Sequence, residues 1–391
     1  MCAVYLDNAA TSYPKPDGVV KEMENYLKNI GASAGRGTYQ RADKAAEIVS
    51  ETRENLASLF NLDDAKRIIF THNITTSINY ILKGILKPGD HVITTEMEHN
   101  SVWRPLKVLE TANVIELSTV STDKDGFFSA GDFEEKIRPN TKLAAVVHGS
   151  NVTGTVFPLE EIYELLNKRD VMLLVDGAQT AGSYPVDLQK VPVDFFTFTG
   201  HKGLLGPAGT GGFYIKEGRE EVLSPFMEGG TGGDASIEAQ PDYLPEKYEA
   251  GTLNLPGIAG LNAAVKYLLQ EGVENIYSHK MELMKVLVEG LKNIEGCEIY
   301  SCPRDMMDNN SGDNAGVISF NLKSINPEEV GYVLDEAFEI MVRTGLHCAP
   351  RAHNSIGTLD KRGTIRVGLG PFNTKEDIEL LLGALDEVVK T

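Results

Sequence analysis

The segment Val171-Met-Leu-Leu-Val-Asp176-Gly-Ala-Gln179 carries an apolar run that ends directly in polar residues, and Phe195-Phe-Thr-Phe-Thr199-Gly-His201-Lys202 repeats this arrangement. Such continuous apolar runs are typical of strands that are covered on both faces. The runs recur between helical segments at 67–71, 91–95, 143–147, 172–175, 195–197 and 211–215. Strands that alternate with helices predict right-handed crossovers and a mostly parallel sheet, hence an α/β fold. Ligands of such sheets bind beyond the carboxyl ends of the strands, where these polar residues stand.

The rest of the chain predicts a second, smaller unit. After residue 256 a long helical region runs to about residue 293, strand-like segments follow at 316–322 and 340–343, and a final amphipathic helix begins after Thr374. At 391 residues the chain has material for two or three domains. We expect residues 1–15 to form an N-terminal segment near the active site, 16–256 a large cofactor-binding domain, and 257–391 a small C-terminal α+β domain.

Charge and cysteine content limit the function classes. The 37 Lys and Arg against 56 Asp and Glu give a net charge of −19, which repels nucleic acid and anionic membranes at long range. Four cysteines without a C-x-x-C pair argue against a disulfide framework and against a zinc ribbon. No signal peptide and no apolar stretch of about 20 residues is visible. We therefore expect a cytoplasmic protein in which a functional cysteine acts as a thiol.

Asp176 and Lys202 are the first candidates for chemistry. Burying a carboxylate is costly unless a cationic partner accompanies it. A bound heteroaromatic cofactor is one solution: the lysine amine forms an imine with its aldehyde, while the aspartate keeps its ring nitrogen protonated. The alternative is that Asp176 caps a helix and that Lys202 lies on the surface.

Four motifs in chain order carry a family resemblance: Tyr5-Leu-Asp-Asn-Ala-Ala-Thr11, Asp176-Gly-Ala-Gln179, Thr199-Gly-His-Lys202 and Arg343-Thr-Gly-Leu-His-Cys-Ala349. Together they resemble the class V aminotransferase superfamily, specifically the cysteine desulfurase and selenocysteine lyase family. The similarity covers almost the whole chain. It implies fold type I, pyridoxal 5′-phosphate and a homodimer, and Leu346-His-Cys348 is similar to the branch with a short cysteine loop.

The resemblance assigns roles around the cofactor ring. Lys202 would form the imine, Asp176 would pair with the pyridine nitrogen, and Gln179 would hydrogen-bond the ring hydroxyl. His99 matches the histidine that stacks on the ring, and we expect it to move protons near the leaving sulfur. Asn151 matches the asparagine beside the ring and the substrate.

A phosphate site is expected where Thr75 and Thr76 open a helix, because free backbone N–H groups there favour an anion. Taken alone, these threonines also fit plain helix caps. The resemblance adds Thr199 and His201 as donors and Thr252 as a residue that reaches the phosphate of the opposite subunit. Ile74 departs from the family pattern, which has glycine at this position.

Cys348 decides the expected function. A thiol attacks as the thiolate, whose pKa falls beside cations, and Arg343 and His347 are close in sequence. The alternatives are a buried, inert cysteine or a metal site with His347 and His353; we predict no metal. Cys2, Cys297 and Cys302 match no motif and are interpreted as incidental.

Arg366 matches the family's arginine for the substrate carboxylate, and its planar guanidinium suits bidentate binding. The alternative is a structural ion pair. Gly368 departs from the family, which often has serine there.

The predicted function is desulfuration of L-cysteine to L-alanine, with the sulfur left on Cys348 as a persulfide for a sulfur-acceptor partner. Selenocysteine lyase is the nearest alternative. Transamination or elimination on the same scaffold would leave Cys348 idle, and a non-catalytic sulfur-carrier scaffold is the alternative from another class.

Overall fold

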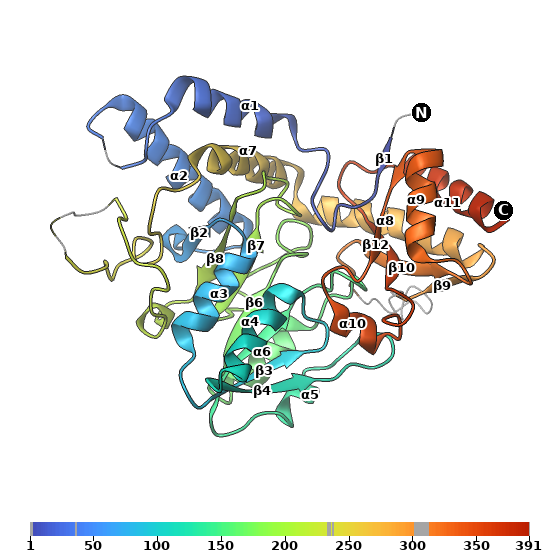
Figure 1. Ribbon diagram of the computed structural model, residues 1–391. Helices are drawn as coiled ribbons and strands as arrows, with labels where there is room; N and C mark the ends of the chain where they lie inside the picture. Colours follow the sequence, from blue (N-terminus) through green and yellow to red (C-terminus); the bar gives the residue numbers. More distant parts are fainter. Residues whose placement is uncertain (1–2, 36, 233–235, 237, 301–312, 391) are drawn as a thin grey trace.

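The structure is a computed structural model that describes the chain apart from residues 1–2, 36, 233–235, 237, 301–312 and 391. Cys2 and Cys302 lie outside the described residues. Figure 1 shows the large unit built on a central sheet, with the C-terminal unit beside it. Within the described residues, no helix is both long and apolar enough to cross a membrane.

A seven-stranded sheet in the order β2-β8-β7-β6-β5-β3-β4 forms the centre of the large unit. Its strands are β2 (Ile68–Thr71), β3 (Asp90–Thr95), β4 (Ile115–Val120), β5 (Thr141–Val147), β6 (Met172–Asp176), β7 (Phe195–Thr199) and β8 (Gly211–Ile215). Only β8 runs antiparallel to its neighbours in this sheet. The mostly parallel α/β sheet predicted from the apolar runs is therefore confirmed, with β4 as an additional edge strand.

Alternate residues of these strands face two different helix layers. Ile69, Val92 and Leu174 pack with α3 (Ile74–Ile85) and α4 (Asn100–Thr111). The opposite face, which includes Phe70 and Phe196, packs against α2 (Gln40–Leu59), α6 (Leu159–Asn167) and α7 (Leu255–Glu271). Both faces are thus covered, which explains why the strands are continuously apolar.

Shorter elements complete the large unit. Helix α1 (Asp17–Asn25) packs on α7, and α5 (Gly131–Glu134) packs on α6. A π-helical turn spans Tyr26–Ile30, and 3₁₀ turns span Ala65–Arg67 and Arg219–Glu221.

The C-terminal unit is a four-stranded antiparallel sheet in the order β12-β13-β10-β9, joined by the parallel pair β1-β11. Its strands are β9 (Cys297–Ile299), β10 (Val317–Leu322), β11 (Ile340–Met341), β12 (Arg343–Gly345) and β13 (Thr364–Gly368), with β1 (Val4–Tyr5) supplied by the N-terminus. Its helices are α8 (Val273–Lys292), α9 (Pro327–Phe338) and α11 (Lys375–Lys390), whereas α10 (Pro350–Ser355), which lies between them in the sequence, places Ala352 in the core of the large unit.

The division between the units follows the packing of α7 and α8. Apolar side chains of α7 such as Leu261 and Leu268 join the core of the large unit, and so does Ile276 at the start of α8, whereas the α8 side chains from Leu283 to Leu291 join the core of the small unit. The two helices meet at Gly272, whose φ of 80° is readily adopted only by glycine. The change from one core to the other thus falls within α8, after Ile276, and the expected boundary near residue 256 stays a prediction.

Candidate active site

Two neighbouring parallel strands bring the polar residues of the two opening segments to one edge of the sheet. Asp176 ends β6 and Thr199 ends β7, with Lys202 three residues further on (Figure 1). Asp176 is 2% exposed and accepts hydrogen bonds from Ala178 N at 3.0 Å and from Ser101 Oγ at 3.3 Å. Burial raises the pKa of its carboxyl, and the charge of Lys202 opposes this rise.

The amine of Lys202 lies in a region of mixed charge. Burial lowers the pKa of Lys202 to about 8, Asp176 acts in the opposite direction, and Arg366 and Arg343 lower the pKa further. The charge of Cys348 raises it. These charges reach Lys202 from segments far apart in the sequence, so the fold brings the predicted lysine, aspartate, arginine and cysteine together.

His99 is the N-cap of α4 and adjoins the same space. Its Nδ1 accepts a hydrogen bond from Ser101 N at 3.0 Å, and Ser101 Oγ lies 2.9 Å from the same nitrogen. Burial, Lys202 and Arg366 lower the pKa of His99 to about 4, so its imidazole is neutral at pH 7. Ser101, which also donates to Asp176, was not predicted; its place two residues after His99 in the first turn of a helix was the available signal.

Arg366 is buried and held on both of its terminal nitrogens. Nη2 donates to Asp7 Oδ1 at 2.7 Å and Nη1 donates to Asn151 O at 3.1 Å, whereas the buried Nε has no partner among the described residues. The ion pair offered as the alternative role therefore exists. Because Nε stays free and Arg343 lies directly opposite on β12, Arg366 can still bind an anion.

Asn151 and Gln179 each donate one hydrogen bond from the side-chain amide nitrogen to a backbone carbonyl. Asn151 Nδ2 donates to His347 O at 2.7 Å, while its buried Oδ1 has no partner among the described residues. Gln179 Nε2 donates to Ala9 O at 3.0 Å. In both side chains the amide nitrogen supports a neighbouring segment and the oxygen is left to accept a hydrogen bond.

Cys348 is an exposed free cysteine in a tightly held turn. His347 and Cys348 have φ values of 47° and 58°, a left-handed conformation that is costly for residues other than glycine. Two hydrogen bonds offset this cost: Asn151 Nδ2 binds the carbonyl of His347, and Asn100 N donates to the carbonyl of Cys348 at 2.8 Å. The thiol is thus presented to solvent from a fixed backbone.

The histidines beside Cys348 are buried. His347 Nε2 lies 3.0 Å from Thr364 Oγ1, and burial strongly lowers the pKa of His347. The ring centroids of His347 and His353 are 5.2 Å apart. Across the part of the chain that the structure describes, no group of three or more His, Cys, Asp or Glu side chains is arranged to hold a metal ion.

The residues expected at the phosphate differ in exposure. Thr199 Oγ1 is buried and has no partner among the described residues. Thr76 N and Oγ1 both donate to Asn73 Oδ1, the cap of α3, and Thr75 is exposed. His201 is half-buried, and burial lowers its pKa to about 4. Thr252 is exposed and lines a small cavity together with Thr76.

Both departures from the family pattern have a local explanation. Ile74 is buried as the first residue of α3, so this turn of the chain places a side chain in the core of the α3 layer. A Cβ at Gly368 would lie 2.6 Å from Ala9 N, too close for any side chain. Glycine at 368 is therefore required by the close approach of the N-terminal segment.

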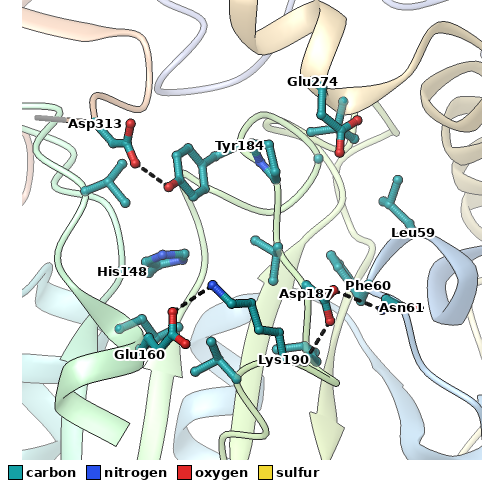
Figure 2. Close-up of a pocket in the computed structure, with 18 of the residues that line it drawn as sticks. Leu59, Phe60, Asn61, His148, Glu160, Tyr184, Asp187, Lys190, Glu274 and Asp313 are labelled. Atoms are coloured by element: carbon teal, nitrogen blue, oxygen red, sulfur yellow. Dashed lines mark hydrogen bonds and ion pairs between the residues drawn. The ribbon is translucent and has the colours of Figure 1, made fainter. Parts of the chain in front are cut away.

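A large cavity lies apart from these residues. It has a volume of about 1180 Å³, and Figure 2 shows His148, Tyr184, Glu160 and Asp313 among its lining. Tyr184 Oη donates to Asp313 Oδ2 at 2.5 Å across one side of it. None of the predicted site residues lines this cavity; Lys202 and Gln179 line a much smaller one together with Lys280.

The fold and the residues at the strand ends define a class V aminotransferase. The family model described as "Aminotransferase class-V" matches residues 4–381, so the chain belongs to this family. Within it, the chain belongs with the cysteine desulfurases. It is 35% identical over 388 residues to the "Probable cysteine desulfurase" of Methanothermobacter thermautotrophicus, covering 98% of this chain and 94% of that protein.

Further relatives agree. The "Cysteine desulfurase" of Haloferax volcanii is 32% identical over 394 residues, covering 98% of this chain and 88% of the relative. The apo structure of the cysteine desulfurase from Thermococcus onnurineus NA1 matches with a TM-score of 0.91 at 34% identity, covering 99% of this chain and 95% of that one. The cysteine desulfurase CsdA (S-sulfonic acid) from Escherichia coli gives a TM-score of 0.87 at 28% identity, with the same two coverages.

Proposed function

We propose that this chain is a cysteine desulfurase that converts L-cysteine to L-alanine and retains the sulfur on Cys348 as a persulfide. The observation that carries the proposal is the grouping of an exposed thiol, a buried amine and a buried arginine. The charge of Cys348 raises the pKa of both Lys202 and Arg366, so the three groups share one site.

The residues present fit pyridoxal 5′-phosphate. Asp176 is a buried carboxylate that the structure leaves without a cation in contact, which suits a protonated ring nitrogen. Buried Thr199 Oγ1 and Asn151 Oδ1 are polar atoms in need of partners, as the phosphate and ring substituents would provide. When bound, this cofactor holds the amino group of the substrate and withdraws electrons from its α-carbon.

Arg366 and Lys202 would bind and deprotonate the substrate. The free Nε of Arg366, beside Arg343, offers the substrate carboxylate a buried positive site. Lys202, with a pKa of about 8, has a substantial neutral fraction near pH 7.5 and can accept the proton of the α-carbon. His99 is neutral at pH 7, so it would lie against the cofactor ring without adding charge and would serve as the base for the substrate thiol.

Cys348 would take the sulfur. Its thiolate attacks the sulfur of cysteine, the carbon–sulfur bond breaks, and the electron pair of that bond returns to the carbon skeleton, which is protonated and leaves as alanine. The sulfur stays on Cys348 as a persulfide, so atoms and electrons balance without an external oxidant. A reducing compartment such as the cytoplasm keeps Cys348 available as a free thiol.

For the phosphate we propose Thr75, Thr76, Thr199 and His201 of the same chain. Thr252 is exposed, which suits our proposal that a homodimer brings it to the phosphate of the partner subunit. The start of α3 adds the positive end of a helix dipole to this group.

The test compares Cys348→Ala with Cys297→Ala. Cys297 is a second free cysteine, half-buried in β9, and burial raises its pKa to about 12. With pyridoxal phosphate and a reducing thiol, wild type and Cys297→Ala should form alanine from cysteine over many turnovers and carry a persulfide, whereas Cys348→Ala should do neither. Undiminished alanine formation by Cys348→Ala would refute the sulfur step.

Two further readouts separate the alternatives. Selenocysteine turnover that survives in Cys348→Ala, with no cysteine turnover in wild type, would assign the chain as a selenocysteine lyase. A keto-acid product would indicate transamination. Loss of the visible absorption band in Lys202→Ala, with the band present in wild type, would exclude a non-catalytic scaffold.

A further inference from the structure

The cavity of about 1180 Å³ is bounded on one side by a connected group of aromatic and acidic side chains. The ring centroids of His148 and Tyr184 are 5.6 Å apart, and those of Tyr184 and Tyr277 are 5.2 Å apart, each pair edge to face. Asp313 accepts hydrogen bonds from Tyr184 Oη at 2.5 Å and from Tyr277 Oη at 3.1 Å. These contacts fix the rings and the carboxylate relative to one another.

His148 presents a buried hydrogen-bond acceptor to the cavity. The residue is 5% exposed and belongs to the cavity lining (Figure 2). Its Nδ1 lies 3.0 Å from Thr180 Oγ1, and because Thr180 Oγ1 donates its own proton to Gly177 O at 3.4 Å, Nδ1 carries the ring proton. Burial lowers the pKa of His148 to about 4, so the ring is neutral at pH 7. Nε2 keeps a lone pair that no described residue satisfies, which calls for an N–H donor from a ligand.

Carboxylates outnumber cations around the cavity. Among the lining residues that the structure describes, six are Asp or Glu and one is Lys190, whose Nζ lies 2.8 Å from Glu160 Oε2. Glu161 and Glu274 are exposed, and neither carboxylate has an ion pair or a side-chain hydrogen bond with a described residue. A bound cation would therefore be attracted, whereas an anion would be repelled.

The acidic positions are spread around the cavity rather than gathered at one point. Figure 2 shows Asp313, Glu274 and Glu160 at separate places around it. Apolar side chains, including those of Phe157 and Leu268, line the same cavity. A single ammonium group reaches only one such position, whereas a chain with several ammonium groups reaches more than one and places its methylene groups against apolar side chains.

We infer that this cavity binds a linear polyamine, with one N–H group donating to His148 Nε2 and the other ammonium groups paired with the cavity carboxylates. The three observations that carry the inference are the unsatisfied neutral acceptor, the excess of carboxylates and their spacing. The inference is independent of the proposed function, because no residue that we assign to the cofactor or the substrate lines the cavity.

The test titrates the holoenzyme by isothermal titration calorimetry with spermidine, which has several ammonium groups, and with butylamine, which has a single one. The visible band of the cofactor is recorded in the same samples, because a primary amine that reacts with the cofactor would alter it. We expect spermidine to bind about tenfold more tightly than butylamine at low salt. His148→Phe, which keeps a ring beside Tyr184 but removes the acceptor, should weaken spermidine binding about tenfold.

Asp313→Asn and Glu274→Gln should each weaken spermidine binding about threefold, because each removes one charge with little change of shape. Glu329→Gln is the matched control. Glu329 is an exposed glutamate on α9, which packs on α11 and the C-terminal sheet, and it does not line the cavity. This variant removes the same charge from a chain of net charge −19 and should keep the wild-type affinity.

Three results would overturn the inference. Equal affinities for spermidine and butylamine would show that the cavity does not select a polyamine. A loss in Glu329→Gln as large as that in Glu274→Gln would show that the attraction is diffuse. An altered cofactor band, with affinities unchanged in all cavity variants, would place the amine at the cofactor instead. Glu274 is exposed on α8, so Glu274→Gln keeps the test decisive even where His148→Phe does not fold.

Discussion

Buried Arg366 and half-buried Asp7 form an ion pair, with Nη2 to Oδ1 at 2.7 Å, that joins β13 to the N-terminal segment. The two residues are 359 positions apart in the sequence. The pair fixes one edge of the guanidinium and leaves Nε free. Asp7 is thus a positioning residue for the arginine that we assign to the substrate carboxylate.

Replacing Asp7 by Ala should lower the free energy of unfolding by about 2 kcal/mol, because it leaves the Arg366 charge buried without its partner. Urea denaturation of wild type, Asp7→Ala, Arg366→Met and the double variant measures this. In the Arg366→Met background the Asp7 substitution should cost much less. Equal costs in both backgrounds would show that the pair is not coupled.

The apoprotein should contain a lysine at position 202 that loses its proton near pH 8. Competitive acetylation followed by peptide mass spectrometry should show the reactivity of Lys202 rising through this pH. Because Asp176 raises the pKa of Lys202, Asp176→Asn should move the transition to a lower pH. An unchanged or higher transition in Asp176→Asn would contradict the placement of the two charges.

Glu98 should make stability depend on pH. It is 1% exposed, its Oε1 accepts from Thr95 Oγ1 and Val147 N, its Oε2 has no partner among the described residues, and burial raises its pKa to about 8. The folded state therefore holds the proton more tightly than the unfolded state does. This contribution is fully present below pH 4.5 and is lost as the pH rises through about 8.

Relative to Glu98→Gln, the unfolding free energy of wild type should fall by about 1.4 kcal/mol per pH unit between pH 4.5 and 8 and level off above. Denaturation across this range measures the difference. The control Glu161→Gln, at an exposed site on α6, should show no such slope. A difference that is flat from pH 4.5 to 8 would mean that Glu98 is ionised in the fold.

Lys280 should make the unfolding free energy rise with pH, in contrast to Glu98. It is 2% exposed and donates to Ala315 O at 2.7 Å and to Ser183 O at 3.3 Å, and burial lowers its pKa to about 7. Between pH 7 and 10.5 the unfolded state binds a proton that the folded state has lost. Relative to Lys280→Met, the unfolding free energy of wild type should therefore rise by about 1.4 kcal/mol per pH unit in this interval.

Lys285→Met provides the control for Lys280 because it removes an exposed lysine from the same helix, α8. Its difference from wild type should have no positive slope. If the difference in unfolding free energy between wild type and Lys280→Met does not change with pH, Lys280 stays protonated in the folded state throughout this pH interval, which would contradict the prediction.

The strands that carry the site were predictable because they are covered on both faces. β5, β6 and β7 are buried throughout or almost so, and their apolar runs are continuous. β4 escaped prediction because it lies at the sheet edge, where Glu116 and Ser118 alternate with apolar residues and only its ends are buried. Helix α8 passes from the core of the large unit to the core of the small unit, and no local sequence pattern encodes that change.

Site residues were predictable where a motif follows a strand, as at Asp176 and Lys202. The residues that hold the site residues in place were harder to predict. Asp7 accepts a hydrogen bond from Arg366, and Asn100 N donates to the carbonyl of Cys348, although the partners are far apart in the sequence. Both supports stand in or beside motifs that were recognised, but pairing requires the fold. The family resemblance assigned Arg366 to the substrate carboxylate, a role that stays a prediction, and it did not indicate that Asp7 would contact the guanidinium.

The pairing of β1 with β11 has a consequence for synthesis on the ribosome. Val4 and Tyr5 leave the exit tunnel long before their partners Ile340 and Met341, and also long before Arg366. Strand β1 must therefore stay unpaired while the large unit folds. Nascent chains that have not yet reached Cys348 and Arg366 would thus hold Asp176 and Lys202 without the thiol and the arginine, so sulfur chemistry has to await the synthesis of both.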